Sequence, residues 1–389
     1  MGIMKKFKSI TSLLIASAFI LSSIGNAFAC TVMLYTDANG RAYVGRTMEF
    51  PGFLPSRLTY YPASARFESV TPDGKQGATF NTKYPILAAT VPLIASSKQD
   101  TFAEGLNDQG LSFTANSLGG NLQTNTSNVP KDKIISAYDF GAWALGNFQT
   151  VAQLKQALVN KEVDVWLPVM AEFGGAWPFH FAFFDKTGEG IVIEWINGQT
   201  SVYDNPVGVM TNNPSFPWQL ENMNNYAYLT NVDKNHGQFN KLKVSNFDGG
   251  ANMNGLPGIE TSPGRFVKAA YYSQFAEKGK TPEKAILILG HVMNNFDRPT
   301  NISIDVANDL PGGERNLTAG NSGKPISEVT SFTVLKDLQQ NHFYIRTIDA
   351  LNYSKFDLGK LSALKTTKVL TFDVIDASTN SDATDLFFK

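Results

Sequence analysis

The sequence predicts an α+β fold in which antiparallel β-sheets pack against outer helices. Strand-like and helix-like segments occur in blocks along the chain rather than in strict alternation, which favours antiparallel sheets over parallel βαβ units. Hydrophobic residues make up 43% and aromatic residues 12% of the 389 positions, a composition typical of a globular protein with a large core. The sequence has no internal repeat, low-complexity tract or convincing linker, so we expect the folded part to form one domain.

Three β-hairpins are predicted where two strand-like segments flank a short polar turn. In the first, an alternating segment at 31–35 is separated from a second strand at 42–48 by a turn that ends in Gly40. The other two hairpins pair 179–184 with 191–196 and 330–335 with 343–347.

Four helices are predicted from apolar residues at helical spacing, at about 136–145, 151–159, 265–275 and 281–296. The last has the clearest start signal. Thr281 suits the N-cap, Pro282 suits the first turn and Glu283 suits the positive end of the helix dipole.

The segment 231–253 is rich in Asn, Gly, Asp and Lys and is predicted to be a long surface excursion. Three interpretations stay open for it: a border of the functional site, an assembly element, or a solvated insertion.

The first 29 residues are interpreted as a secretory signal peptide that is removed. Three lysines open the chain, a short apolar run follows at 13–21, and Ala27 and Ala29 supply the small residues that a signal peptidase requires. An uncleaved anchor is the alternative, but the run is well short of the roughly 20 apolar residues of a membrane helix. We therefore expect an exported mature chain, 30–389, that does not insert into a membrane.

The charge of the mature chain argues against a nucleic-acid partner. Removal of the signal takes away three lysines and no acidic residue, which leaves 30 basic against 34 acidic residues and changes the net charge from −1 to −4. Nucleic-acid-binding proteins usually carry a basic surface, and this chain has neither a like-charge block nor a polybasic tail.

The chain has a single cysteine, Cys30, directly after the predicted cleavage site. It cannot form an internal disulfide, and a lone thiol in an oxidising compartment is open to oxidation. If cleavage makes Cys30 the first residue, its thiol and its free α-amine belong to the same residue. An α-amine has a pKa of about 8 and a thiol one of about 8.5, so the two can act as base and nucleophile near neutral pH. This is the logic of an N-terminal nucleophile hydrolase.

Two other interpretations of Cys30 stay open. A lipidation site would need an apolar residue such as leucine three positions before the cysteine and small residues in between. Ala27 and the bulky Phe28 fit that pattern poorly. Cys30 can also be an inert residue near a cleavage site.

No competing catalytic motif stands out in the sequence. The histidines are scattered without metal-ligand spacing, and each is expected to be structural or solvated. They are His180, His236, His291 and His342. Neither a G-x-S-x-G elbow nor a P-loop occurs. We therefore expect no metal and no cofactor.

Four segments resemble the choloylglycine hydrolase family, which holds bile salt hydrolases and penicillin V acylases. They are, in chain order, 30–50, 205–226, 255–270 and 330–347. The first begins with Cys and has an Arg sixteen residues later, and the third contains the R-F-V pattern. The segments keep their order and span most of the mature chain. The resemblance implies the four-layer αββα sandwich of N-terminal nucleophile hydrolases, formed by 30–389 as a single catalytic domain.

The resemblance also assigns roles at the start of the mature chain. Cys30 would be the nucleophile and its own amine the base. Arg46 would lie beside the thiol, where its charge favours the thiolate. Glu49 stands where the family usually has Asp, and its carboxylate would orient the N-terminal residue.

Three further residues match the family's site. Asn212 matches its oxyanion-hole Asn, Asn116 matches a second position near it, and Arg265 matches the Arg of the R-F-V pattern. Neutral amide donors suit this chemistry, because they stabilise a negative oxygen without neutralising the nucleophile.

The expected activity is hydrolysis of a linear, non-peptide amide through a thioester, with a conjugated bile salt as the first choice of substrate. Penicillin V acylase and N-acyl homoserine lactone acylase are the alternative activities. An exported binding protein or lipoprotein that keeps the fold is the alternative without catalysis. Four aromatic residues suit an apolar acyl group but can equally belong to the core: Phe50, Phe53, Tyr60 and Tyr61. The family and the signal imply a bacterial protein of the periplasm or the medium, and a homotetramer is one expectation for its assembly.

Overall fold

The computed structural model describes residues 29–376 apart from 52–54, 93–97, 170–176 and 306–325. The predicted signal peptide, except for Ala29, and also Phe53 therefore lie outside the described residues.

Two large antiparallel sheets make up the middle of the described part of the chain. In the first sheet the strand order is β14 (Val209–Met210), β1 (Thr31–Thr36), β2 (Ala42–Pro51), β18 (Ile326–Asp337), β19 (His342–Thr347) and β20 (Ser354–Asp357), and β17 (Ile304–Asp305) pairs with the start of β18. In the second sheet the order is β13 (Ser201–Asp204), β12 (Gly190–Glu194), β11 (Phe179–Phe184), β8 (Ser112–Ser117), β7 (Thr101–Asn107), β6 (Ile86–Val91), β3 (Arg57–Tyr61) and β21 (Lys368–Thr371).

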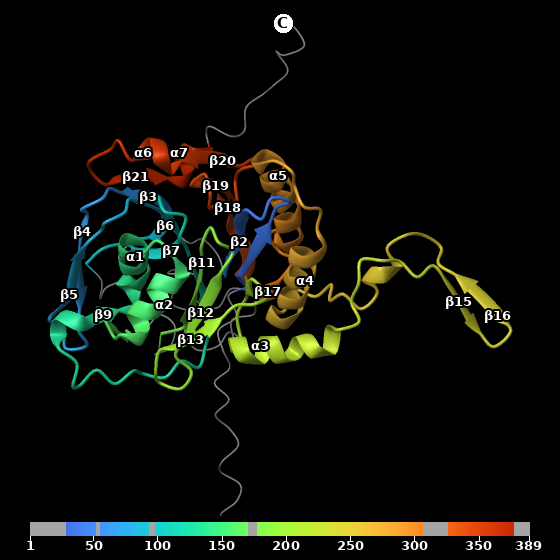
Figure 1. Ribbon diagram of the computed structural model, residues 1–389, viewed down its shortest axis with the longest axis horizontal. Helices are drawn as coiled ribbons and strands as arrows, with labels where there is room; N and C mark the ends of the chain where they lie inside the picture. The colour runs from blue at the N-terminus through green and yellow to red at the C-terminus, as the bar shows by residue number, and fades with distance from the viewer. Residues whose placement is uncertain (1–28, 52–54, 93–97, 170–176, 306–325, 377–389) are drawn as a thin grey trace, which may run out of the picture.

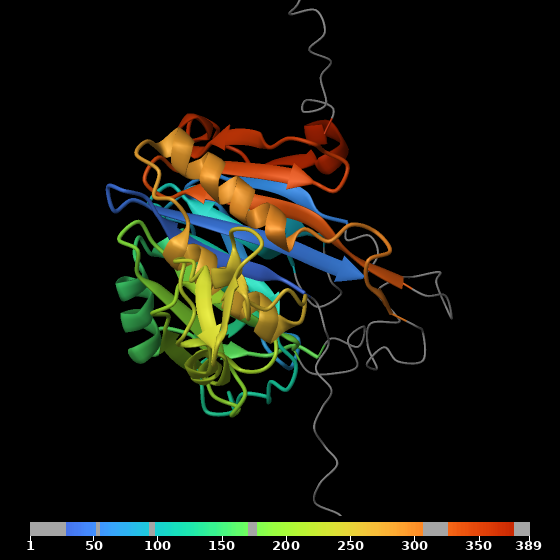
Figure 2. The same ribbon diagram turned by 90° about the vertical axis from the view of Figure 1, so that its right-hand side faces the viewer.

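Helices cover the outer face of each sheet. The second sheet is covered by α1 (Ala137–Asn147) and α2 (Val151–Val159), and the first by α4 (Ser262–Phe275) and α5 (Pro282–Met293). Figure 1 shows the layers side by side, with α1 and α2 at the left and α4 and α5 at the right. Figure 2 shows the orange helices on the outer face of the first sheet. The fold is therefore α+β, a four-layer αββα sandwich, and this prediction is confirmed.

Shorter elements complete the described chain. They are the paired strands β4 (Arg66–Val70) and β5 (Gln76–Asn81), β9 (Ile134–Ser136) and β10 (Asp164–Trp166), β15 (His236–Phe239) and β16 (Leu242–Ser245), the α-helices α3 (Phe216–Asn222), α6 (Leu358–Leu361) and α7 (Phe372–Asp376), and 3-10 turns at Lys131–Lys133, Met223–Tyr226, Ala251–Met253 and Asn294–Phe296.

The predicted hairpins and helices are present with small shifts of their ends. The hairpins are β1–β2, β11–β12 and β18–β19, and the helices are α1, α2, α4 and α5. The Thr281 side chain accepts a hydrogen bond from the backbone N–H of Lys284, so it caps α5 as predicted. The helix α4 begins at Ser262, three residues before the predicted start, and β12 ends at Glu194.

Two hydrophobic clusters fill the spaces between the layers. One lies between the sheets and beneath α4 and α5, and the other lies between the second sheet and α1 and α2. The strand β11 contributes to both, since Ala182 and Phe184 belong to the first cluster while Phe181 and Phe183 belong to the second. Because both faces of this strand are covered, apolar residues occupy successive positions instead of alternating ones.

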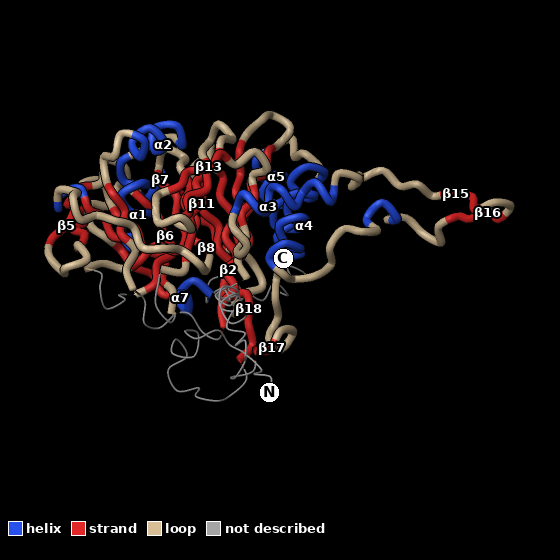
Figure 3. Tube along the Cα trace, turned by 90° about the horizontal axis from the view of Figure 1, so that it is seen from below, coloured by secondary structure: helices blue, strands red, loops and turns tan. Residues whose placement is uncertain are grey.

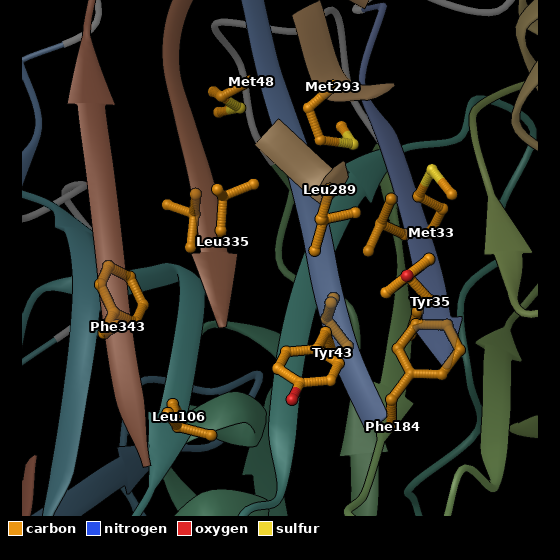
Figure 4. Packing of buried hydrophobic residues seen from close by; sticks show 14 of the residues in the cluster. Met33, Tyr35, Tyr43, Met48, Leu106, Phe184, Leu289, Met293, Leu335 and Phe343 are labelled. Carbon is orange, nitrogen blue, oxygen red and sulfur yellow. The ribbon is translucent and has the colours of Figure 1, made fainter. Parts of the chain in front are cut away.

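The helix α5 packs directly on β2. Figure 4 shows Leu289 and Met293 of this helix over the strands of the first sheet. A side chain at Gly45 of β2 would meet Met293 and Leu289, at 2.7 and 3.0 Å from an added Cβ atom. The glycine therefore permits the close approach of helix and strand.

The segment from 230 to 254, here called the arm, projects away from the sandwich (Figures 1 and 3). It contains the β15–β16 hairpin, and most of its side chains are exposed. It is a surface excursion as predicted, and its hairpin had no signal in the sequence analysis.

A glycine-to-alanine pair tests the packing of the turn between β7 and β8. Gly110 has a φ of +84°, and an added Cβ atom would lie 2.3 Å from the carbonyl oxygen of Leu338. Gly40 has a φ of +76° but nothing within 4 Å of such an atom. We expect Gly40→Ala to cost roughly 1 kcal/mol of unfolding free energy, from backbone strain alone. Gly110→Ala should cost roughly 3 kcal/mol, because the backbone of the neighbouring turn must also move. Urea unfolding of both variants measures this, and equal losses would contradict it.

Candidate active site

Cys30 lies directly before β1 and is 2% exposed. Its backbone N–H donates to Asn212 Oδ1 at 2.9 Å, and its carbonyl oxygen accepts from Arg265 Nη1 at 2.6 Å. Its sulfur lies 3.5 Å from Arg46 Nη2 and 3.6 Å from the sulfur of Met48. The structure thus brings together three residues that are far apart in the sequence around the single cysteine.

Arg46 extends from β2 toward the second sheet. Its Nη2 atom donates to the carbonyl oxygen of Ala115 at 3.0 Å, and its Nε atom lies 3.8 Å from Glu104. Glu104 is itself paired with Lys336, and all three charged side chains are fully buried. The guanidinium is therefore held between the sheets with one edge at the thiol of Cys30.

Arg265 is 2% exposed and binds both the segment of Cys30 and Thr31 and the side chain of Asn212. Its Nη1 atom also donates to Thr31 Oγ1 at 2.7 Å, its Nη2 atom donates to Asn212 Oδ1 at 2.8 Å, and its Nε atom donates to the carbonyl oxygen of Glu260 at 2.9 Å. The helix α4 begins just before Arg265, so the side chain reaches across from its first turn to β1. Asn212 Oδ1 accepts hydrogen bonds from the backbone N–H of Cys30 and from Arg265 Nη2. Its Nδ2 atom donates to the carbonyl oxygen of Ser117 at 2.9 Å.

Asn116 lies near the end of β8, close to Asn212 but with a different set of contacts. Its Nδ2 atom donates to the carbonyl oxygens of Thr211 at 2.9 Å and Met210 at 3.3 Å. Both of its N–H bonds are thus directed at the backbone of β14 and the residue after it. The neighbouring residue, Ser117, is the one that contacts Asn212.

Glu49 lies near the end of β2 and is 1% exposed. Its carboxylate accepts a hydrogen bond from Thr330 Oγ1 at 3.0 Å. Burial raises the pKa of Glu49 to about 7, against the lowering effect of the nearby Arg265 charge. The carboxyl group therefore changes its protonation near neutral pH.

Burial also dominates the thiol of Cys30. It raises the pKa of this thiol to about 11, while Arg46 lowers it and Glu49 raises it further. In the described chain Ala29 still precedes Cys30, so the Cys30 nitrogen is a peptide N–H and not an amine. A buried thiol without a base stays protonated at neutral pH and is a poor nucleophile in that state.

Sequence reasoning missed Glu328 and Arg298. Glu328 accepts a hydrogen bond from the backbone N–H of Ala29 at 2.6 Å, and its carboxylate pairs with Arg298. Both charged side chains are about nine-tenths or more buried. The one signal available for Glu328 was a glutamate beside a strand-like segment. This signal did not indicate which residues the carboxylate would bind.

His180 was expected to be structural or solvated, and it lies buried within β11. Its Nδ1 atom faces Glu194 at 2.9 Å, and its Nε2 atom faces the carbonyl oxygen of Thr211 at 3.1 Å. His180 thus contacts the backbone of Thr211, the residue before Asn212. No contact described for His180 involves Cys30. His236 and His291 are exposed.

The aromatic residues considered for an acyl pocket are core residues where the structure describes them. Tyr60 belongs to the cluster between the sheets, and Phe50 and Tyr61 belong to the other. Phe53 lies outside the described residues. These positions therefore carry no information about the substrate.

No group of three or more His, Cys, Asp or Glu side chains within the described ranges is arranged to hold a metal ion. No helix in the same ranges is both long enough and apolar enough to cross a membrane.

Comparison with known proteins gives consistent matches. A family model described as linear amide C-N hydrolases, choloylglycine hydrolase family, matches residues 30–372. A bile salt hydrolase/transferase of Clostridium perfringens is 24% identical over 331 residues, 85% of this chain and 93% of that protein. A penicillin V acylase of Pectobacterium atrosepticum is 25% identical over 298 residues, 71% of each chain.

Solved structures match the fold over almost the whole chain. A variant of the conjugated bile acid hydrolase from Clostridium perfringens aligns with a TM-score of 0.72 and 21% identity, and covers 91% of this chain and 100% of that one. The penicillin V acylase from Agrobacterium tumefaciens aligns with a TM-score of 0.69 and 20% identity, and covers 90% and 94% of the two chains.

The pKa of Glu49 predicts a stability effect with a defined sign. Between about pH 4.5 and pH 7 the folded chain keeps a proton on Glu49 that the unfolded chain has lost, so stability falls as the pH rises through this window. Glu49→Gln should remove this fall, which is roughly 1 kcal/mol of unfolding free energy per pH unit. Urea unfolding at intervals from pH 4.5 to 8 measures the difference between the two proteins. Glu189→Gln, in an exposed turn, is the control and should keep the wild-type slope; an unchanged slope in Glu49→Gln would contradict the assignment.

Proposed function

The chain belongs to the choloylglycine hydrolase family of linear amide C-N hydrolases, and on that premise we propose that it is an exported hydrolase of conjugated bile salts with Cys30 as an N-terminal nucleophile. The observation that carries the proposal is the convergence on one cysteine of two buried guanidinium groups and a carboxamide, from Arg46, Arg265 and Asn212. The family match begins at residue 30, the first residue after the proposed cut.

In the proposed reaction, the α-amine of Cys30 takes the proton of the thiol, and the thiolate attacks the carbonyl carbon of the amide. The carbonyl oxygen becomes negative in the tetrahedral intermediate. The intermediate collapses to a thioester as the C–N bond breaks, and the ammonium of Cys30 gives its proton to the leaving amine. The α-amine of Cys30 then deprotonates a water molecule that attacks the thioester. This step releases the carboxylic acid and restores the thiol.

The contacts favour Asn212 over Asn116 as the donor to the negative oxygen. Asn116 directs both N–H bonds of its amide at the carbonyls of Met210 and Thr211. Asn212 Nδ2 donates to one backbone carbonyl, that of Ser117 at 2.9 Å, and to Ser117 Oγ at the longer distance of 3.3 Å, so one N–H bond can exchange the hydroxyl for a substrate oxygen. We assign Asn116 to holding the 210–211 segment and Asn212 to the oxyanion, an interaction typically worth roughly 3 kcal/mol of barrier.

Similarity supports bile salts as the substrate class. Relatives from Clostridium perfringens and Lactiplantibacillus plantarum are described as bile salt hydrolase/transferase, and each aligns over at least 85% of this chain. Penicillin V is the second candidate, because the acylase of Pectobacterium atrosepticum is as similar in identity, at 25%. Both substrates are amides with a bulky apolar acyl group, and so are long-chain N-acyl homoserine lactones.

We further propose that the protein is exported by a bacterium to the periplasm or the medium, on the basis of the signal-like first 29 residues. Ala29 and Cys30 are both buried in the folded chain. A peptidase that needs access to the bond between them acts most readily before this region folds, as it would during export.

We also propose that the protein forms a homotetramer through the arm. The arm exposes apolar side chains that a hairpin cannot bury by itself: Val232, Phe239, Leu242 and Phe247. An isolated two-stranded hairpin is only marginally stable in water, so contacts with a second copy would hold it in place.

The proposed activity is tested by release of amine from four amides: glycocholate, taurocholate, penicillin V and a long-chain N-acyl homoserine lactone. The full chain is expressed with its own first 29 residues, and mass spectrometry establishes whether Cys30 is the free N-terminus. We expect release from the two bile salt conjugates, and Cys30→Ser should lower it by roughly 10³-fold or more.

Thr36→Ser, in the same strand away from the site, is the control and should keep wild-type rates. Release from penicillin V alone would replace the bile salt assignment by the second candidate. No release from any of the four by a protein with a free Cys30 would refute the substrate proposal as a whole, and an active protein lipidated at Cys30 would refute the mechanism.

The proposed assembly predicts that the double substitution Phe239→Ser, Phe247→Ser lowers the oligomeric state. Both side chains are highly exposed and make no contribution to the core, so the fold should be unaffected. Light scattering coupled to size-exclusion chromatography should give a tetramer for wild type and a smaller species for the variant. Val159→Ser, exposed on α2, should remain tetrameric; a monomeric wild-type protein would rule out the arm as an assembly element.

A further inference from the structure

Glu328 is a buried carboxylate at the point where the proposed mature chain would begin. It lies on β18, and its Oε1 atom accepts the backbone N–H of Ala29 at 2.6 Å. It is 5% exposed. No sequence motif and no step of the proposed reaction uses this residue. A role for Glu328 at the amine rests on the proposed function, since it concerns the state in which Cys30 is the N-terminus.

The position of Glu328 is fixed from several directions. Its carboxylate pairs with Arg298, and Arg298 Nη2 donates to the carbonyl oxygen of Glu260 at 2.8 Å. The same carbonyl accepts from Arg265. The backbone N–H of Arg298 donates to Thr330 Oγ1 at 2.8 Å, and Thr330 binds the carboxylate of Glu49. The two carboxylates near the start of β1 are thus held by one connected set of buried groups.

Removal of the preceding residues changes what Glu328 can bind. Ala29 leaves together with the N–H that Oε1 accepts, and the cut creates an ammonium group on the next nitrogen of the chain. Successive backbone nitrogens are at most about 3.7 Å apart, since each peptide unit spans roughly 3.8 Å between Cα atoms. The new donors of Cys30 therefore lie within one peptide unit of the position at which Oε1 now accepts the Ala29 N–H.

The balance of charge around this nitrogen also requires a carboxylate. The charged and titratable groups around Cys30 and its partners are the Cys30 thiol, Arg46 and Glu49 of β2, Glu260 before α4, Arg265 of α4, Arg298 after α5, and Glu328 of β18. Three of these are cations. Burial raises the pKa of Glu49 to about 7, so Glu49 is not a full negative charge at neutral pH. An ammonium in this setting needs a further anion to be tolerated.

We propose that Glu328 is the positioning residue of the catalytic amine: after cleavage its carboxylate accepts a hydrogen bond from the α-amine of Cys30, directly or through one water in the space that Ala29 leaves. Asn212 Oδ1 already accepts from the same nitrogen at 2.9 Å. With two acceptors on fixed sides, the third direction of the amine is left for the proton that it exchanges with the thiol. Glu328 touches no substrate atom in this arrangement and acts through Cys30.

The proposal has a signature in pH that a merely structural role lacks. A nearby negative charge makes loss of a proton harder, from the amine and from the thiol alike. Glu328→Gln removes that charge and the carboxylate that pairs with Nη1 of Arg298, so both protons should leave at lower pH. Glu328→Asp keeps the charge on a side chain one methylene shorter. It should keep the wild-type pH dependence while it lowers the rate.

The single cysteine makes a direct test possible. The rate at which iodoacetamide alkylates Cys30 is measured from pH 5 to 11 in wild type, Glu328→Gln and Glu328→Asp, each expressed as the full chain and each shown by mass to begin at Cys30. We expect the alkylation profile of Glu328→Gln to move to lower pH by about one unit. Hydrolysis of the best amide, measured as kcat/KM over the same range, should move in the same direction. Asp139→Asn, which removes a different buried carboxylate bonded to Ser69, is the control and should keep the wild-type profiles.

The outcomes separate this inference from the proposed function. Unshifted profiles in Glu328→Gln, with Cys30-dependent hydrolysis in wild type, overturn the role of Glu328 and leave the function standing. A shifted alkylation profile in a protein that hydrolyses none of the amides supports the role of Glu328 and refutes the substrate. If Glu328→Gln does not fold, Glu328→Asp decides: a profile displaced from wild type despite the retained charge overturns the proposal.

Discussion

The candidate site depends on one buried guanidinium group. Arg265 donates to the carbonyl oxygens of Cys30 and Glu260, to Thr31 Oγ1 and to Asn212 Oδ1, and it is almost fully buried. Its planar arrangement of N–H groups fixes four acceptors from three separate segments relative to one another, which the single rotatable ammonium of a lysine would not do. Burial lowers its pKa, but an arginine starts so high that it stays charged. Loss of any one acceptor would leave a buried charge partly unsatisfied, so these segments are held together as a unit.

The second constraint is that the site spans the two sheets. The strand that follows Cys30 and the strand that carries Arg46 belong to the first sheet, while Ala115, which accepts from Arg46, belongs to the second. Lys336 of the first sheet and Glu104 of the second meet in the same layer and compensate each other's charge beside Arg46. A shift of one sheet over the other would break these contacts together. The hydrophobic cluster between the sheets is therefore also what sets the distance from Arg46 to the thiol, because it fixes the separation of the two layers.

Local signals in the sequence were enough for some elements and not for others. The three hairpins and the capped helix at Thr281 were predicted because turn residues and caps act on their immediate neighbours. The strands β3 to β8 were not predicted, since their pairing depends on contacts across the sheet rather than on one marked turn. Family resemblance supplied the site residues around Cys30, but Glu328 is 299 positions from Ala29, and only folding brings the two together. Spacing likewise did not show that the Asn116 amide would bind the backbone carbonyls of residues 210 and 211, because only the fold brings these segments together.

The burial of the bond that precedes Cys30 has a consequence for the order of events. With Ala29 in place, its N–H satisfies Glu328 and the thiol stays protonated at neutral pH, because burial raises its pKa to about 11. In the folded, uncut chain the bond before Cys30 is thus flanked by two buried residues and the thiol is protonated. A cut made before the first sheet closes yields an amine that enters the site as the sheet forms, and the same buried acceptors then bind it. If the leading residues are removed during export, as proposed, activation is coupled to location, because a chain that is not exported folds around an inert thiol.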